Sequence, residues 1–204
     1  MALSCPVDLD TARLRHEIQS IYSRVASDPA SGFHFHRGPG YAAERLGYDA
    51  AALAALPDEC TASFAGVANP HRIAPLTPGA SVIDIGCGAG MDLMLAAQAV
   101  GRHGRAIGID MTDAMAQRAR SAARALDFPH VEVRAGDALD LPVEPDSIDF
   151  AISNGVLNLV PDKRQAFAEV FRVLKPGGQF LYGDIVVAGE LAESIRRDID
   201  LWTG

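Results

Sequence analysis

Ser81-Val-Ile-Asp-Ile-Gly-Cys-Gly-Ala-Gly90 decides the fold of this chain of 204 residues. A short apolar run leads into three glycines at alternate positions, and residues 91–100 then have the apolar density of a helix packed on a sheet. Because glycine lacks a Cβ and tolerates positive φ, the chain can turn sharply here and lie against a ligand. The stretch therefore predicts a buried strand, a ligand-binding loop and a helix.

Two ligand classes compete for this loop. Gly86 and Gly88 fit the first two glycines of the dinucleotide fingerprint Gly-x-Gly-x-x-Gly, but the third would fall at Met91, one residue after Gly90. Asp84 at the mouth of the loop would repel a pyrophosphate, yet it suits an amine or a sulfonium. S-adenosylmethionine carries both groups, so we predict it as the cofactor and disfavour a nicotinamide-dependent oxidoreductase. Taken alone, the loop could also be a tight connection without a ligand.

Strands and helices alternate after the loop. This order predicts an α/β fold, a doubly wound and mostly parallel sheet of the Rossmann-like type. We expect further strands over residues 105–109, 130–134, 148–152 and 179–183. Helices are expected from a Thr112 cap to about Leu126, from an Asp162 cap to Val173, and over residues 190–201.

The first part of the chain differs from the rest. A helix over residues 11–26, a turn-rich stretch and alanine-rich segments predict an N-terminal helical cap of residues 1–75 on a domain of residues 76–204. A complete fold of this type adds two antiparallel strands beside the fifth, but the residues after Gly183 suffice for one helix. We therefore expect the C-terminal strands to be missing, and either a homodimer that completes the sheet edge or a fragment.

Composition restricts the partners. The 26 acidic and 18 basic residues give a net charge of −8, which argues against nucleic acid. There is no apolar run of about 18 residues to cross a membrane and no signal peptide, so we expect a cytoplasmic protein. The three cysteines, Cys5, Cys60 and Cys87, are too scattered for a disulfide framework or a metal site. A small molecule is the expected partner.

Polar residues follow the ends of three predicted strands. Asp110 lies at about the offset of 20 residues expected for an acid that binds both ribose hydroxyls, although a strand-terminal cap is the alternative. Asp137 in Gly136-Asp-Ala138 could accept a hydrogen bond from an adenine amino group or form a turn. Asn154 points toward the same crevice or forms a turn. These residues predict that the ligand lies along the carboxyl ends of the strands.

With these residues, the chain resembles class I S-adenosylmethionine-dependent methyltransferases and, among them, the arsenite methyltransferases. The resemblance covers nearly the whole chain. It is carried by Leu46-Gly-Tyr48, Leu56-Pro57, Asn69-Pro70, Val82-Ile-Asp-Ile-Gly-Cys-Gly-Ala-Gly90, Gly108-Ile-Asp-Met-Thr112, Ile152-Ser-Asn154, Asn158-Leu-Val-Pro-Asp-Lys163, Arg172-Val-Leu-Lys-Pro-Gly-Gly178 and Asp184-Ile185.

The resemblance places the cofactor along the loop and the strand ends. It implies that the methionine part lies near the loop, the ribose and adenine near the second and third strands, and the reactive end near the fourth. Together with the strand-end reasoning it predicts ten cofactor-binding residues: Asp84, Gly86, Gly88, Gly90, Asp110, Met111, Gly136, Asp137, Ala138 and Asn154.

The departures from the resemblance concern the acceptor. Arsenite methyltransferases bind arsenic through cysteines, and in Gly-Cys-Gly-Asn-Pro the first of these corresponds to Val67 here. Gly155 stands at the second position, and the third would fall just after Gly204, where the sequence ends. The fold and cofactor of the resembling family are therefore expected here, but not its substrate.

Residues for proton transfer are the least defined part of the prediction. His34 and His36 would share one face of a strand, where they could act as a base or bind a metal, or else be partly buried structural residues. We select His34, His36 and Asp184 as catalytic candidates. The predicted function is methyl transfer to an unidentified small molecule; an arsenite methyltransferase-like enzyme with an altered metalloid site and a non-catalytic cofactor-binding or partner subunit remain alternatives.

Overall fold

The computed structural model describes residues 10–33, 35–186 and 188–189, and its strands form one parallel sheet. The strand order is β3-β2-β1-β4-β5, and every neighbouring pair is parallel. The strands are β1 (Ser81–Ile85), β2 (Arg105–Asp110), β3 (Val131–Ala135), β4 (Ile148–Asn154) and β5 (Leu174–Gly183). The predicted doubly wound sheet is confirmed.

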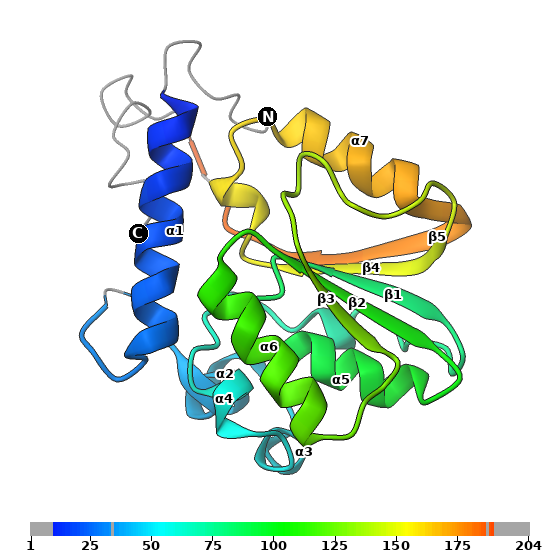
Figure 1. Cartoon of the computed structure of the whole chain (residues 1–204), viewed down its shortest axis with the longest axis horizontal. Coiled ribbons are helices and arrows are strands. Elements are labelled where there is room, and N and C mark those ends of the chain that lie inside the picture. Colours follow the sequence, from blue (N-terminus) through cyan, green and yellow to red (C-terminus); the bar gives the residue numbers. More distant parts are fainter. Residues whose placement is uncertain (1–9, 34, 187, 190–204) are drawn as a thin grey trace.

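Helices cover both faces of this sheet (Figure 1). Two of them, α5 (Met91–Val100) and α6 (Asp113–Ala125), pack on one face against β1, β2 and β3. On the opposite face, α7 (Lys163–Val173) packs against β5. Parallel strands buried on both faces need continuous apolar runs, and in β1 the side chains of Val82, Ile83 and Ile85 are at most 1% exposed.

The described residues before β1 form one long helix, three short α-helices and a 3-10 helix. They are α1 (Thr11–Ser27), α2 (Gly38–Leu46), α3 (Ala50–Ala54), α4 (Asp58–Thr61) and the 3-10 helix η1 (Pro70–Arg72). A second 3-10 helix, η2 (Leu157–Leu159), follows β4. Helix α1 contacts α6 and stands at the end of the sheet toward which the strands run (Figure 1). The boundary predicted at residue 75 stays a prediction.

Both helices start directly after the predicted capping residue, but only one of the two side chains makes a capping hydrogen bond. Asp162 is the N-cap of α7, where its carboxylate accepts from the Gln165 N–H, as expected. Thr112 occupies the N-cap of α6, but its side chain makes no capping hydrogen bond. The prediction was wrong in this respect because the Thr112 hydroxyl bonds to the carboxylate of Asp110.

The fifth strand begins earlier than predicted. It starts at Leu174 rather than at Gln179, and the register shifts between Ile148, paired with Leu174, and Phe150, paired with Gln179. The Pro-Gly-Gly sequence that we expected to lie outside the strand is therefore a bulge within it, where Gly177 has a φ of 83°. The helix predicted over residues 190–201 lies outside the described residues.

No helix in the described part of the chain is long and apolar enough to span a membrane.

Candidate functional site

A cavity opens at the carboxyl ends of the strands, where doubly wound sheets bind their ligands. Its empty volume is about 1180 Å³, part of it open to solvent. The walls come from the glycine loop, from the residues that follow β2, β3 and β4, from α1 and from residues 60–66. All ten residues predicted to bind the cofactor line this cavity. The structure thus brings together side chains from four strand ends and from the N-terminal helices.

The glycine loop has the backbone conformation that its sequence predicts. Gly86, Gly88 and Gly90 have φ values of 70°, 54° and 95°, which L side chains rarely adopt. A Cβ on Gly86 would lie 2.4 Å from the Val156 side chain. At Gly88 no atom lies within 4 Å of that position. The loop therefore packs tightly against Val156, just after β4, at its first glycine and leaves open space at its second.

Asp84, the last residue but one of β1, is a buried acid with an unused oxygen. Its side chain lines the cavity and is 2% exposed, and Oδ2 has no hydrogen-bond partner. Burial raises the pKa of this carboxyl well above its usual range, and the nearby charges of Asp92 and Asp110 raise it further. A buried polar atom without a partner is unfavourable, so this oxygen suits a ligand that brings a donor or a positive charge.

Asp110 at the end of β2 is fixed by two backbone groups. One of its oxygens accepts from the Gly88 N–H and the other from the Thr112 N–H, both at 2.8 Å. Burial raises the pKa of Asp110, while these two hydrogen bonds lower it. The Thr112 hydroxyl bonds to the same carboxylate, and these three hydrogen bonds leave part of its lone-pair capacity free. The acid is therefore held rigidly between the glycine loop and β2, with capacity left for hydroxyl groups of a ligand.

Helix α1 closes the side of the cavity formed by the second and third strand ends. The Gln19 amide donates to the Met111 carbonyl at 2.9 Å. The Arg15 guanidinium pairs with the Asp137 carboxylate, and Leu14 and Ile18 pack near Met111. The predicted acid after β3 is therefore partly engaged by the protein, and α1 covers the region where the resemblance expects adenine.

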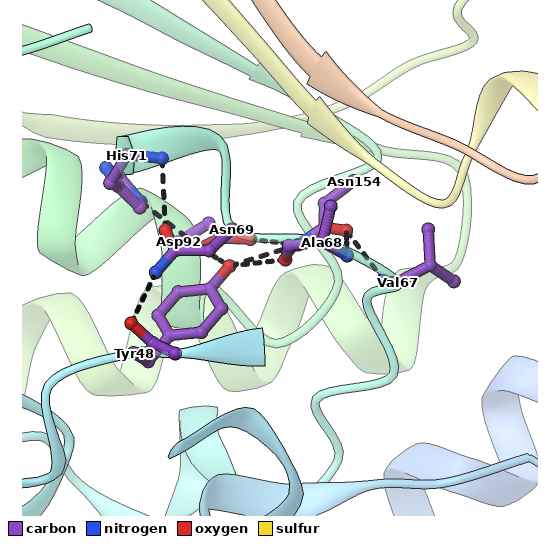
Figure 2. A network of polar contacts seen from close by, with 8 residues as sticks. Tyr48, Val67, Ala68, Asn69, His71, Asp92 and Asn154 are labelled. Carbon is purple, nitrogen blue, oxygen red and sulfur yellow. Dashed lines mark hydrogen bonds and ion pairs between the residues drawn. The ribbon is translucent and has the colours of Figure 1, made fainter. Parts of the chain in front are cut away.

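Asn154 at the end of β4 is held by protein groups on both ends of its amide (Figure 2). Its oxygen accepts from the backbone N–H groups of Val67 at 2.8 Å and Ala68 at 3.0 Å. Its nitrogen lies 2.8 Å from the Ala68 carbonyl, 3.0 Å from Asp92 Oδ2 and 3.1 Å from the Tyr48 hydroxyl. An amide has two donor hydrogens and two acceptor lone pairs. Its hydrogen-bonding capacity is thus used within the protein, although the side chain lines the cavity.

Asp92 in the first turn of α5 is the centre of this network. Its Oδ1 accepts from the Tyr48 hydroxyl at 2.7 Å and lies 3.1 Å from His71 Nε2, while Oδ2 faces Asn154. The carboxylate is buried, at 6% exposure. Burial together with the charge of Asp92 raises the pKa of Tyr48, so that hydroxyl remains a neutral donor. We call Tyr48, His71, Asp92 and Asn154 the Asp92 network.

Sequence reasoning missed Asp92, His71 and Ser63. A lone acid inside the apolar helix of residues 91–100 was the available signal for Asp92, because such a position needs partners. Ser63 is 4% exposed and lines the cavity, and its hydroxyl has no hydrogen-bond partner. No pattern in the sequence marks Ser63, since it is one polar residue among small ones.

The two described catalytic candidates, His36 and Asp184, do not line the cavity. His34 lies outside the described residues. His36 is exposed and stacks on Tyr41 with ring centroids 5.2 Å apart, and neither it nor Asp184 is among the residues that line the cavity. Asp184 is half-buried after β5 and accepts from the backbone N–H groups of Ile185 and Asn158. Burial raises the pKa of Asp184.

Two residues at the reactive end predicted by the resemblance are neighbours in the structure. A Cβ built on Gly155 would lie 3.4 Å from Val67 Cγ1. Gly155 lines the cavity together with Phe64, Val156, Leu159 and Val160, so this wall is apolar. Tyr22 of α1 also lines it, and burial with the charges of Asp110 and Asp184 raises the pKa of Tyr22 to about 12.

The fold and the cavity define a doubly wound α/β protein with a ligand site at the strand ends. A sequence model described as a methyltransferase domain matches residues 76–203, and the chain therefore belongs to the methyltransferase domain family.

Relatives of known structure and sequence agree with this family. The chain is 42% identical to an arsenite methyltransferase of Halobacterium salinarum over 79% of its length and 41% of the relative's. An arsenic(III) S-adenosylmethionine methyltransferase from Chlamydomonas reinhardtii superposes with a TM-score of 0.64 at 35% identity, covering 71% of this chain and 51% of that one. A phosphoethanolamine N-methyltransferase of Haemonchus contortus, solved with S-adenosylhomocysteine, has a TM-score of 0.56 at 27% identity over 65% and 31%.

These findings confirm S-adenosylmethionine as the cofactor of the domain. The chain spans less than half the length of the archaeal relative. The two solved relatives act on different acceptors, an arsenic(III) compound in one case and a phosphoethanolamine compound in the other.

Proposed function

We propose that this chain transfers a methyl group from S-adenosylmethionine to a small molecule. The observation that carries the proposal is the unpartnered Oδ2 of Asp84 in a strongly acidic cavity. Among the described residues that line it, Asp84, Asp92, Asp110 and Asp137 are acids, and the one cation, Arg15, pairs with Asp137. Such a wall favours a positively charged ligand, and S-adenosylmethionine carries an ammonium and a sulfonium.

Nine of the ten predicted cofactor residues contact the ligand in this proposal, and Asn154 holds the backbone of Val67 and Ala68 instead. Asp84 accepts from the ammonium group, and Ser63 supplies a second free polar group on the facing N-terminal segment. The carboxylate of Asp110 accepts from the ribose hydroxyls with the lone pairs that Gly88 and Thr112 leave free. Met111, Gly136, Asp137 and Ala138 surround the base under α1, and Gly86, Gly88 and Gly90 let the backbone approach the ligand.

Positioning dominates the chemistry of this site. The bound sulfonium supplies an activated methyl group, and transfer is an in-line displacement by a lone pair of the acceptor. The protein needs to bind both reactants, align them and exclude water. The apolar wall of Phe64, Gly155, Val156 and Leu159 excludes water next to the acceptor. Some acceptors lose a proton on methylation. For these, Asp184, whose pKa is raised, is the candidate base among the described residues that lie after the strands.

Calorimetric titration tests the cofactor part of the proposal. S-adenosylmethionine and S-adenosylhomocysteine should bind with one site per chain, and NAD should give no heat of binding. Binding of NAD in place of S-adenosylmethionine would overturn it. Incubation with methyl-labelled cofactor and candidate small molecules then tests catalysis, because a non-catalytic subunit binds the cofactor without forming a labelled product.

An altered arsenite methyltransferase is the second candidate, since two of the relatives act on arsenic compounds. The first two cysteine positions of the resemblance hold Val67 and Gly155, and Cys60 lines the cavity. Burial raises the pKa of the Cys60 thiol to about 12, which disfavours the thiolate that binds metals. We therefore expect no labelled arsenical from sodium arsenite, and formation of one would favour this candidate instead.

A further inference from the structure

We propose that the Asp92 network is a positioning device that locks the segment of residues 66–68 onto the glycine-loop helix and so shapes the acceptor end of the cavity. The inference rests on the proposed function, because it concerns the same site. Its residues act through the backbone that they hold and not by direct contact with the reacting atoms. The network joins four parts of the chain that are far apart in the sequence: Tyr48 after α2, His71 in η1, Asp92 in α5 and Asn154 at the end of β4.

The position of Asp92 links the two reactants. Asp92 lies in the first turn of α5, two residues after Gly90, the last glycine of the loop at the cofactor site. Its carboxylate therefore moves with the glycine loop. Through Asn154, which accepts from Val67 and Ala68, the same carboxylate fixes the backbone on the other side of the cavity. Figure 2 shows Asn154 beside Val67 and Ala68, in one network with Asp92 and Tyr48.

The segment fits its place closely. A Cβ on Gly66 would lie 2.3 Å from Asn154 Nδ2, and one on Gly183 of β5 would lie 2.1 Å from the Ala68 Cβ. Glycine at both positions allows the segment to lie against β4 and β5. Gly66 lines the cavity beside Phe64 and Gly155. A displacement of the segment would therefore move the apolar wall against which the acceptor lies.

Burying the carboxylate of the Asp92 network also costs free energy, and holding the segment in place would not by itself require this cost. A buried carboxylate that is held by side-chain hydrogen bonds is a costly way to fix a loop, because well-packed apolar side chains often give equal or greater stability. Directional hydrogen bonds to Val67 and Ala68 instead fix one backbone orientation. This orientation is what alignment of two reactants requires, since a displacement of about 1 Å can lower a rate about 100-fold.

Three variants of the whole chain test the inference: Asp92→Asn, Tyr48→Phe and, as a matched control, Asp113→Asn. Asp113 is exposed and also lies in the first turn of a helix, α6, so its variant loses the same interaction with the helix N-terminus but none of the network. Tyr48→Phe removes one hydrogen-bond donor to Asp92. It replaces Asp92→Asn in the measurements if Asp92→Asn does not fold. The dissociation constant of S-adenosylhomocysteine is measured by calorimetry for each.

The first measurement is hydrogen exchange of the Val67 and Ala68 amides, which needs no acceptor. We expect exchange about tenfold faster or more in Asp92→Asn, less acceleration in Tyr48→Phe and no change in Asp113→Asn, because exchange requires the hydrogen bond to open. Unchanged protection of both amides in Asp92→Asn and Tyr48→Phe would overturn the inference.

The second measurement is the rate of methyl transfer from saturating labelled cofactor to the acceptor found in the screen above. We expect about a 10- to 100-fold lower maximal rate in Asp92→Asn, with the dissociation constant of S-adenosylhomocysteine changed less than about threefold. An equal loss of rate and cofactor affinity would show a general structural role and overturn the inference. If the wild type did not bind the cofactor, the proposed function would be refuted. The hydrogen-exchange measurement would still test whether the Asp92 network holds the backbone of Val67 and Ala68.

Discussion

Asp84 and Asp92 stand on either side of the glycine loop, and the comparison between them explains how the site is built. Both are acids that line the same cavity, at 2% and 6% exposure. Asp84 leaves one oxygen without any partner. Asp92 faces the side-chain donors of Tyr48, His71 and Asn154. Burial alone therefore does not show whether an acid serves the fold or a ligand.

The difference lies in which element faces each carboxylate. Asp92 projects from a helix toward the N-terminal segment, which supplies two of its donors, and toward the end of β4, which supplies the third. Asp84 lies at the end of a central strand, where its neighbours include the acids Asp92 and Asp110. One carboxylate is thus satisfied by folding, and the other is left for a ligand to satisfy.

The largest expected difference is in stability without cofactor. Asp92→Asn should lower the free energy of unfolding by roughly 2–4 kcal/mol, because buried donors lose a charged acceptor. Asp84→Asn should leave the free energy of unfolding unchanged or raise it, because the variant removes a buried acid that lies near Asp92 and Asp110 and has one oxygen without a partner. Urea denaturation of both variants measures the contrast. Equal destabilisation by the two substitutions would contradict it.

The second difference is in cofactor affinity, and here Asp84 should matter more. Asp84→Asn removes a charge-assisted hydrogen bond to the ammonium group, which contributes about 1.5–3 kcal/mol, or about 10- to 100-fold in the dissociation constant. Calorimetry with S-adenosylmethionine measures the loss, and Asp113→Asn is the control for a generic reduction of negative charge. If Asp84→Asn bound the cofactor as tightly as the wild type, the unpartnered oxygen would not be a ligand contact.

The sequence was sufficient to predict the Asp84 side of this comparison. Its loop, its strand ends and its charges are local features, and each glycine that was expected to take a positive φ does so. Asp110 was expected at the end of a strand beside the loop, and the structure places it there with a hydrogen bond from Gly88. Parallel strands align their carboxyl ends, so residues at those positions meet whatever the rest of the fold does.

The Asp92 side could not be predicted in this way. Tyr48 and His71 precede Asp92 by 44 and 21 residues in the N-terminal segment, and Asn154 follows it by 62 residues at the end of β4. These contacts arise only when that segment packs on the sheet. The sequence did not indicate that the Asn154 amide bonds to the backbone of Val67 and Ala68, and its predicted contact with the cofactor stays a prediction. The bulge in β5 was missed for a related reason, since Pro-Gly-Gly indicates a break locally and only pairing with β4 extends the strand through it.

The pH dependence of the site sharpens the comparison further. The pKa of Asp84 is higher in the folded, ligand-free protein than in the unfolded chain, where it is about 3.9. Protonated Asp84 therefore stabilises the fold fully below the unfolded-state pKa, and this stabilisation is lost as the pH rises through the folded-state pKa. Cofactor affinity should change in the opposite direction, rising with pH as the carboxylate that we propose to bind the ammonium group forms. We would measure the unfolding temperature and the cofactor dissociation constant of the wild type and of Asp84→Asn across about pH 4 to 8. The difference between the two proteins isolates the titration of Asp84. Parallel curves for the two proteins would contradict both expectations.

The smallest expected effect concerns Ser63, a neutral counterpart of Asp84 on the N-terminal segment. Its buried hydroxyl also lacks a partner, so Ser63→Ala should leave the stability of the ligand-free protein unchanged or raise it. Cofactor affinity should fall about 2- to 10-fold, because a neutral hydrogen bond contributes about 0.5–1.5 kcal/mol.

Ser153→Ala supplies the matched control for this substitution. Ser153 is 1% exposed, and its hydroxyl donates to the Ile85 carbonyl at 3.1 Å, so its removal should lower the free energy of unfolding by about 1 kcal/mol. A Ser63→Ala variant that lost stability in the same way and kept its cofactor affinity would assign Ser63 to the fold. Unpartnered oxygens would then indicate the ligand only where they carry charge, as in Asp84.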